Sequence, residues 1–175
     1  GAARGIVFHD ARSLEDAGRI ATAALTTTGT VTRAEHEVVE VHPLHDEPLD
    51  TLLALASAAE IAAGDHPLAR AIAGYAKTRG VAPASVRRAT HAPGRGVSAL
   101  TAKGERVLLG NRQLLFDEGV SVALAEEDAA RAEARGHTAL FLARDGKARA
   151  VIAGRDEVRA DARAASVTVA PASMR

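Results

Sequence analysis

The chain has 175 residues, the size of one ordinary domain or of a small domain attached to part of another. Its 22 Lys and Arg balance its 22 Asp and Glu, so no net positive field exists to attract nucleic acid or an anionic membrane. Aromatic residues make up only 2%, which leaves few side chains for stacking on bases. The absence of Cys excludes disulfides, thiolate metal sites and cysteine nucleophiles.

Targeting and membrane signals are absent from the sequence. No apolar run approaches the roughly 20 residues of a membrane-spanning helix, and residues 1–8 do not have the pattern of a signal peptide. We therefore expect a soluble, cytoplasmic chain.

The first part of the chain predicts a β-α-β unit. Two short apolar runs favour strands, and Ser13 is placed to cap the helix between them. The expected elements are a strand at 6–8, a helix at 14–20 and a strand at 22–25. A polar loop over 26–32 follows, and alternating apolar residues then predict a strand at 35–41.

Two helices are expected next, at 48–63 and 67–80, joined through Gly64-Asp65-His66. Leu and Ala recur at helical spacing in the first helix. The second begins with Pro67 and ends at Gly80, the usual places for these two residues.

The second half of the chain predicts mostly strands. Lys103-Gly104 and Asp145-Gly146 are typical hairpin turns, and Asn111 and Ser121 are placed to cap helices. The expected strands are 86–89, 97–102, 105–109, 138–143 and 148–153, with a short helix after Asn111, a longer one at 122–135 and a polar helix start at 155–163. This order predicts an α+β fold, an antiparallel sheet of about six strands flanked by helical hairpins.

Several residues are of types found in binding sites, but each also has an explanation from the fold alone. Gly94-Arg-Gly-Val-Ser-Ala99 fits the dinucleotide fingerprint G-x-G-x-x-A, but a strand rather than a helix is predicted after it. These glycines either let a ligand approach the backbone or form a turn. His66, before a helix start, is a cap or a ligand contact, and Asn111 fits an N-cap.

A His and carboxylate cluster precedes the first long helix. Its members are His36, His42, His45, Asp46, Glu47 and Asp50. Its loop composition and the lack of a fixed ligand spacing favour an ordinary loop over a zinc site. No P-loop, no G-x-S-x-G motif and no Ser-His-Asp arrangement is present.

Taken in order, these segments resemble the nucleotide-binding domain of heavy-metal-transporting P-type ATPases, the copper and zinc pumps. The resemblance covers about residues 5–165, and its motifs are far more specific together than singly. They are Thr28-Gly-Thr-Val-Thr32, His66-Pro-Leu-Ala-Arg-Ala-Ile72, Gly94-Arg-Gly-Val97, Val107-Leu-Leu-Gly-Asn111 and Gly136-His-Thr-Ala-Leu-Phe-Leu-Ala-Arg-Asp-Gly146.

The resemblance implies a site for ATP or ADP, with Mg²⁺ carried by the nucleotide. His66 would orient the adenine end, and Glu60, or else Asp65, would stand for a family Glu that contacts adenine. The remaining implied nucleotide-binding residues are Gly94, Gly96, Val97, Gly110 and Asn111. Because Gly96 begins a strand, we expect Gly96→Val to crowd the ligand locally and leave the fold largely intact.

The resemblance also divides the chain into a partial phosphorylation domain at 1–32, a nucleotide-binding domain at 33–153, and a return segment with a tail at 154–175. Thr26 stands where the family has its phosphorylated Asp, and Thr27 where it has the next Lys. The family's Thr-Gly-Asp and Gly-Asp-Gly-x-Asn-Asp segments do not occur in the sequence. A Thr phosphate ester is not an acyl phosphate, so we expect no catalytic residue and no turnover by this chain alone.

Three functions follow from these observations. The leading one is a nucleotide-binding module on the cytoplasmic face of a metal pump, working with phosphorylation, actuator and membrane domains. The second is a non-catalytic regulatory or interaction module with weak or no nucleotide binding. The third, a phosphatase of the haloacid-dehalogenase type, needs an Asp where Thr26 stands and is disfavoured.

Overall fold

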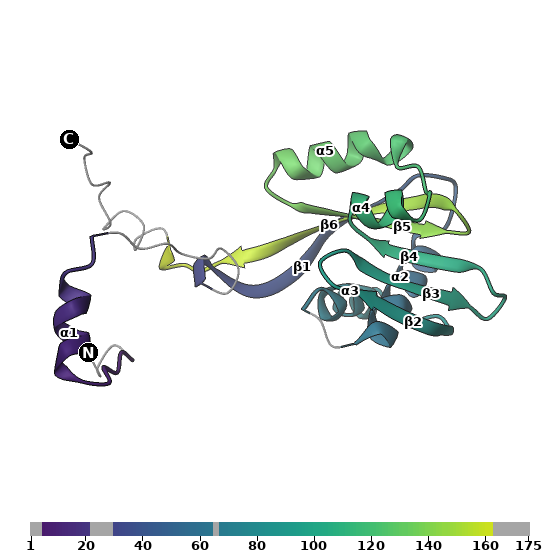
Figure 1. Cartoon of the computed structure of the whole chain (residues 1–175). Helices are drawn as coiled ribbons and strands as arrows, with labels where there is room; N and C mark the ends of the chain where they lie inside the picture. Colours follow the sequence, from purple (N-terminus) through teal and green to yellow (C-terminus); the bar gives the residue numbers. More distant parts are fainter. Residues whose placement is uncertain (1–4, 22–29, 65–66, 163–175) are drawn as a thin grey trace.

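The computed structural model describes residues 5–21, 30–64 and 67–162. Its centre is a six-stranded antiparallel sheet in the order β1-β6-β5-β4-β3-β2 (Figure 1). The strands are β1 Thr32–Pro43, β2 Val86–Ala92, β3 Gly96–Thr101, β4 Arg106–Gly110, β5 Thr138–Arg144 and β6 Lys147–Val158. The helices are α1 Ala11–Gly18, α2 Leu49–Ala63, α3 Pro67–Thr78, α4 Arg112–Asp117, η3 Ala123–Ala125 and α5 Glu126–Ala134. The predicted α+β class and six-stranded sheet are confirmed.

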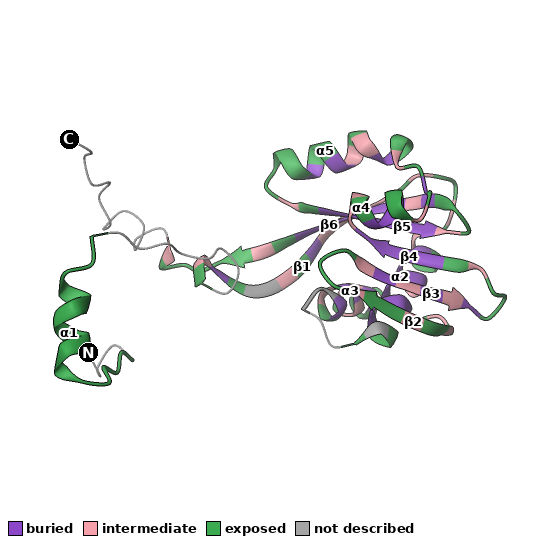
Figure 2. Cartoon of the chain, viewed as in Figure 1, coloured by how far each residue is buried: buried purple, intermediate pink, exposed green. Residues whose placement is uncertain are grey.

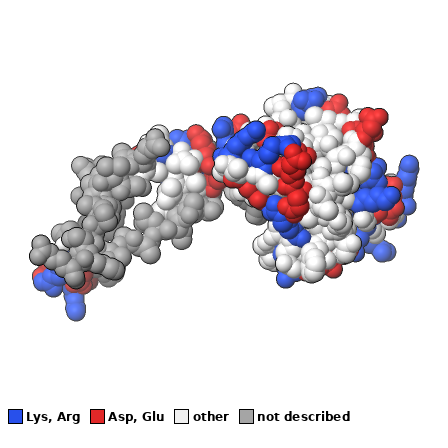
Figure 3. Space-filling view, turned by 90° about the horizontal axis from the view of Figure 1, so that it is seen from above, with Lys and Arg blue, Asp and Glu red and all other residues white. Residues whose placement is uncertain are grey.

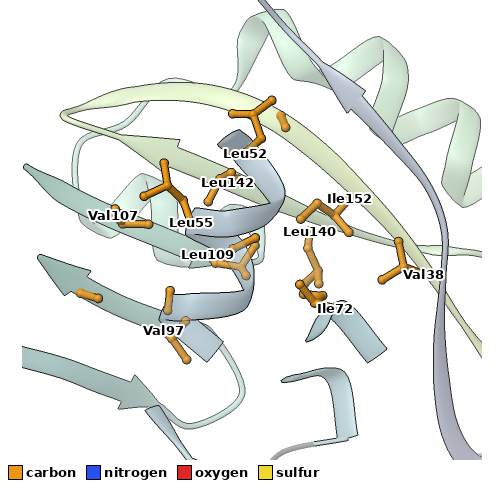
Figure 4. Close-up of a cluster of buried hydrophobic side chains, with 14 residues drawn as sticks. Val38, Leu52, Leu55, Ile72, Val97, Val107, Leu109, Leu140, Leu142 and Ile152 are labelled. Carbon is orange, nitrogen blue, oxygen red and sulfur yellow. The ribbon is translucent and has the colours of Figure 1, made fainter. Parts of the chain in front are cut away.

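Helices cover both faces of the sheet. Leu52 and Leu55 of α2 pack with Leu109 and Leu142 of the central strands (Figure 4). The alternate strand residues, among them Phe141, pack on the opposite face with α4 and α5. Since both faces are covered, the central strands are apolar along their whole length rather than alternating. Figure 2 shows this buried interior under an exposed outer layer.

The predicted hairpin turns are confirmed and fix the strand register. Asp145 and Gly146 have φ of 50° and 73°, the pair of positive values that a two-residue hairpin turn requires. Gly104, with φ of 86°, makes the turn between β3 and β4. The predicted helices around residues 64–66 are confirmed as α2 and α3, with bounds that differ by a few residues.

The predicted strand at Ile6–Phe8 is wrong. These residues have no regular structure, and the side chain of Val7 is 87% exposed. An apolar run forms a strand only beside a partner strand, and none of the described strands lies against it. The helix after it begins earlier than predicted, because Asp10 rather than Ser13 caps it. The strand predicted at 22–25 lies outside the described residues.

The helix start predicted at 155–163 is also wrong in its first residues. Residues 155–158 continue β6, where Arg155 pairs with Glu37 and Asp156 with His36 of β1. The Arg155 guanidinium donates to the Glu37 carboxylate at 2.8 Å. Ladder bonds to β1 override the local helical pattern. The two strands thus form an arm that projects from the body, where acidic and basic side chains lie next to one another (Figures 1 and 3).

Smaller differences concern element ends. The helix predicted at 122–135 is a 3₁₀ turn followed by α5, and the Ser121 hydroxyl accepts the Ala123 N–H at 3.3 Å. β2 is longer than the predicted 86–89 and contains an irregularity at Arg88, which has φ of 52°. Within the described ranges, every helix is too short or too polar to span a bilayer.

Candidate functional site

A pocket of about 250 Å³ lies at one end of the sheet, on the face that α2 covers. It lies where β2 and β4 end and where β3 and β5 begin, with the C-terminal part of α2 as its wall. We call it the sheet-end pocket. It is lined by Glu60, His91, Gly94, Arg95, Gly96, Val97, Leu109, Gly110, Asn111, Thr138 and Leu140.

The pocket has a buried inner wall and an exposed rim. Val97, Leu109 and Leu140 are at most 7% exposed and make the inner wall apolar. His91, Arg95 and Thr138 are exposed and make the rim polar. An apolar interior with a few placed polar groups is the usual composition of a small-molecule site.

The glycines of strands β3 and β4 are required by the fold. Gly96 and Gly110 face each other across the two strands. A Cβ on Gly96, whose φ is +144°, would lie 2.2 Å from the Leu109 carbonyl oxygen. A Cβ on Gly110 would lie 2.3 Å from the Arg95 carbonyl oxygen. Both positions therefore demand glycine whether or not a ligand binds, which contradicts our expectation that Gly96→Val leaves the fold largely intact.

Gly94 differs from these two glycines. Its φ of +71° favours glycine, but nothing lies within 4 Å of where its Cβ would be. The backbone at this turn therefore faces open space beside the pocket, where a ligand can approach it.

Asn111 holds the turn between β2 and β3 against α4. Its side-chain oxygen accepts the Leu114 N–H at 3.0 Å and caps α4, as predicted. Its side-chain nitrogen donates to the Gly94 carbonyl at 3.0 Å, and its backbone N–H donates to the Arg95 carbonyl at 2.8 Å. One residue thus fixes both the helix start and the glycine turn.

Glu60 is the one acidic residue among the described residues that line the pocket. Its side chain is only 4% exposed, and burial raises the pKa of its carboxyl to about 7. Burial is the one cause of this shift, and no hydrogen bond or ion pair is found between the carboxyl and another residue in the described ranges. A buried acceptor of this kind fits a ligand with an N–H or amino donor.

Arg95 lies at the rim, between the two glycines of the turn. Its guanidinium forms an ion pair with Asp117 at the end of α4, and its side chain is 51% exposed. Gln113 donates to the other oxygen of Asp117 at 2.7 Å. The ion pair therefore directs the charged end of Arg95 toward the end of α4, while the residue itself lines the pocket mouth.

The structure brings together most of the predicted site residues. Glu60, Gly94, Gly96, Val97, Gly110 and Asn111 all line the sheet-end pocket. His66, the alternative Asp65, and Thr26 with Thr27 lie outside the described residues. Sequence reasoning missed His91, Arg95, Leu109, Thr138 and Leu140. Arg95, Leu109, Thr138 and Leu140 lie inside motifs of the resemblance, whereas His91 lies outside them.

The acidic and histidine-rich loop before α2 is tied into the fold. Glu47 forms ion pairs with Arg144 at 2.5 Å and Arg149 at 3.8 Å. The ring of His45 contacts the Ala148 carbonyl at 3.2 Å. Among the described residues no group of three or more His, Asp or Glu is arranged to hold a metal ion.

Comparison of the sequence with known proteins finds copper pumps. A copper-exporting P-type ATPase of Staphylococcus haemolyticus is 33% identical over 164 residues, covering 94% of this chain and 20% of that protein. A probable copper-exporting P-type ATPase V of Mycobacterium tuberculosis is 35% identical over 165 residues, covering 93% of this chain and 21% of that protein. The chain spans about a fifth of the length of these curated relatives. No protein-family model matches the chain.

Solved structures show the same arrangement. A zinc-transporting PIB-type ATPase in its E2·Pi state is 31% identical with a TM-score of 0.63, over 89% of this chain and 25% of that one. The N-domain of HMA8, a copper-transporting P-type ATPase, has a TM-score of 0.55 at 23% identity, over 67% of this chain and 98% of that one. The catalytic domain of the CPx-ATPase CopB-B, studied for its conformational changes upon nucleotide binding, has a TM-score of 0.62 at 19% identity over 90% of this chain and 51% of that one, which shows the fold alone.

The six-stranded sheet with helices on both faces is the fold of a P-type ATPase N-domain. Within that class, the chain is homologous to the N-domain segment of the copper- and zinc-transporting P-type ATPases.

Gly96→Ala is expected to destabilise the fold by at least about 2 kcal/mol, because the added Cβ meets backbone and the φ is unfavourable. Gly74→Ala is the matched control: this helical glycine has nothing within 4 Å of its Cβ position, and alanine there should raise stability by up to about 1 kcal/mol. Urea denaturation measures both. Equal, small effects would contradict the role of the β3–β4 contact.

Glu60→Gln is expected to change how stability depends on pH. The pKa of the folded-state carboxyl, about 7, lies above its ordinary value of 4.5, so the folded state binds the proton more tightly. The wild type should therefore lose stability relative to the variant as pH rises from 4.5 to about 7, and no further above it. Glu127→Gln on exposed α5 is the control for the loss of one surface carboxylate. A flat difference for Glu60→Gln would show that its carboxyl is hydrated.

Proposed function

We propose that this chain binds an adenine nucleotide, ATP or ADP, in the sheet-end pocket. The observation that carries the proposal is convergence: positions far apart in the sequence, which the resemblance assigns to a nucleotide site, line one pocket. They come from α2, from the turn before β3, and from the junction of β4 with α4. The catalytic domain of CopB-B, which has the same fold, changes conformation upon nucleotide binding, and this favours a nucleotide as the ligand.

The adenine base fits the inner part of the pocket. Its faces would pack against Val97, Leu109 and Leu140, and its amino group would donate to the Glu60 carboxyl. The exposed turn at Gly94 leaves the main chain accessible to the ribose side of the ligand. His66 would complete the adenine end from the junction of α2 and α3.

In a longer pump this module would present the γ-phosphate to a phosphorylation domain on the cytoplasmic side of the membrane. Copper or zinc would be the cargo, as the names of the relatives suggest. Mg²⁺ would arrive on the nucleotide phosphates, since the described residues offer no ligand cluster of their own. The division at 1–32, 33–153 and 154–175 belongs to this proposal.

The second candidate is a regulatory module that keeps the fold without phosphoryl transfer. The Thr26-Thr27 pair, in place of Asp and Lys, favours it. The two candidates differ in whether nucleotide occupies the sheet-end pocket.

Titration with ATP should give binding in the micromolar to millimolar range, about −8 to −4 kcal/mol. Chemical-shift changes should be largest at Glu60, Gly94 and Asn111. His66→Ala should weaken binding by about 1.5–3 kcal/mol, as expected for one hydrogen bond to a strongly polar group.

His42→Ala is the matched control for this experiment. His42 also precedes Pro-Leu, but its ring lies beside Glu40 at 3.3 Å on β1, and it is not among the residues that line the pocket. Equal losses for both variants would show that the wrong His-Pro-Leu was chosen. A spectrum unchanged at millimolar ATP would favour the regulatory module.

No phosphoenzyme should form on this chain. Phosphoryl transfer needs an in-line nucleophile and cations to neutralise the developing charge, and Thr26 and Thr27 supply neither a carboxylate to accept the phosphoryl group nor an ammonium group. Incubation with γ-labelled ATP and Mg²⁺, then acid precipitation, should leave no hydroxylamine-sensitive label.

Thr26→Asp alone should also remain unlabelled, because an Asp without Mg²⁺-binding carboxylates gains little from its position. Label on the unmodified chain that hydroxylamine releases would identify another carboxylate, such as Asp10 or Asp156, as the acceptor. That result would overturn the alignment of the loop at 26–32.

A further inference from the structure

We infer that Arg95 is a positioning residue for the phosphates of the nucleotide, so that the sheet-end pocket prefers phosphorylated nucleotides over the nucleoside. The inference rests on the proposed nucleotide site and adds to it a residue that sets ligand choice. Four features of Arg95 support it: its fixed backbone, its place at the rim, its unique charge there, and its partner on α4.

The backbone of Arg95 is fixed on both sides. Its N–H donates to the Ala92 carbonyl at 3.0 Å, and its carbonyl accepts the Asn111 N–H at 2.8 Å. Gly96, the next residue, is locked against β4 by the close contact described above. The Cα of Arg95 therefore has a fixed position relative to the pocket, and its side chain starts at the pocket mouth.

The charges of the pocket are separated along its depth. The single carboxyl, Glu60, lies on the buried wall, while Arg95 lies on the exposed rim. Arg95 is the one Lys or Arg among the described residues that line the pocket. A ligand with an amino donor at one end and negative charge at the other matches this order, and phosphates would point to the rim.

Asp117 pairs with the Arg95 guanidinium without using all of its donors. A guanidinium has five N–H donors in a planar fork, so it can bind a carboxylate and a phosphate together. Asp117 also offsets part of the positive charge that a phosphate would meet, since the two side chains form an ion pair. Removing the Asp117 charge should therefore strengthen phosphate binding, whereas removing the Arg95 charge should weaken it.

The test compares ATP, ADP, AMP and adenosine on the full chain by nuclear magnetic resonance titration. Wild type should bind ATP more tightly than adenosine. Arg95→Gln should weaken ATP binding by about two- to fivefold, the range of an exposed charge pair, and leave adenosine binding unchanged. Most of the difference in affinity between ATP and adenosine should disappear in this variant.

Asp117→Asn distinguishes an electrostatic role of the pair from a structural one, because only an electrostatic role predicts tighter ATP binding in this variant. The Asn keeps an oxygen for Gln113 and loses only the charge, so ATP should bind about two- to fivefold more tightly while adenosine is unaffected. Arg87→Gln is the matched control: it removes the same charge from exposed β2, outside the pocket, and should change neither ligand.

Each outcome decides the inference. If Arg95→Gln and Asp117→Asn both weaken ATP and adenosine equally, the pair only braces the turn and the inference is overturned. If ATP and adenosine bind the wild-type pocket with equal affinity, Arg95 does not contribute to phosphate binding and the inference is overturned, while the proposed nucleotide site stands. If neither ligand shifts the pocket resonances, the proposed function itself fails.

Discussion

The close approach of β3 and β4 at Gly96 and Gly110 is the constraint on which the site depends. Side chains at either position would place a Cβ within 2.3 Å of a backbone carbonyl oxygen across the strands. Because both are glycines, the β2–β3 turn lies against the start of α4, where Asn111 can bond to it. A wider spacing would break this connection. The pocket mouth, the glycine turn and the helix cap therefore form one unit.

The other wall of the pocket depends on small residues in α2. Ala56, Ser57 and Ala59 are fully buried, and their size lets the helix pack closely on the sheet. This packing carries Glu60, one residue further along, into the interior at the end of the strands. This packing is consistent with the low aromatic content of the chain, since an Ala-rich helix that lies close to the sheet leaves no space for large rings.

The sequence predicts those features that depend on neighbouring residues. Asp145-Gly146 defined a hairpin, Asn111 a cap and Pro67 a helix start, because turn and cap geometry is local. The prediction from sequence failed where pairing with a distant segment determines the structure: residues 155–158 are a strand only because β1 pairs with them. The site followed the same rule. The motif glycines were identified, whereas Leu109 and Leu140 join the pocket only through sheet register.

The residues of the pocket also differ in what they say about function. Gly96, Gly110 and Asn111 are each explained by the fold alone, so a chain that had lost its ligand would need them just as much. Glu60 is different, because its burial costs stability when the carboxyl is ionised and no described residue compensates that cost. Gln or Met would fill the same space at a smaller cost in folding free energy, because neither side chain ionises. A buried carboxyl that no described residue pairs with, on the wall of a pocket with an apolar interior, is therefore the feature of the described structure that most favours the proposed ligand site.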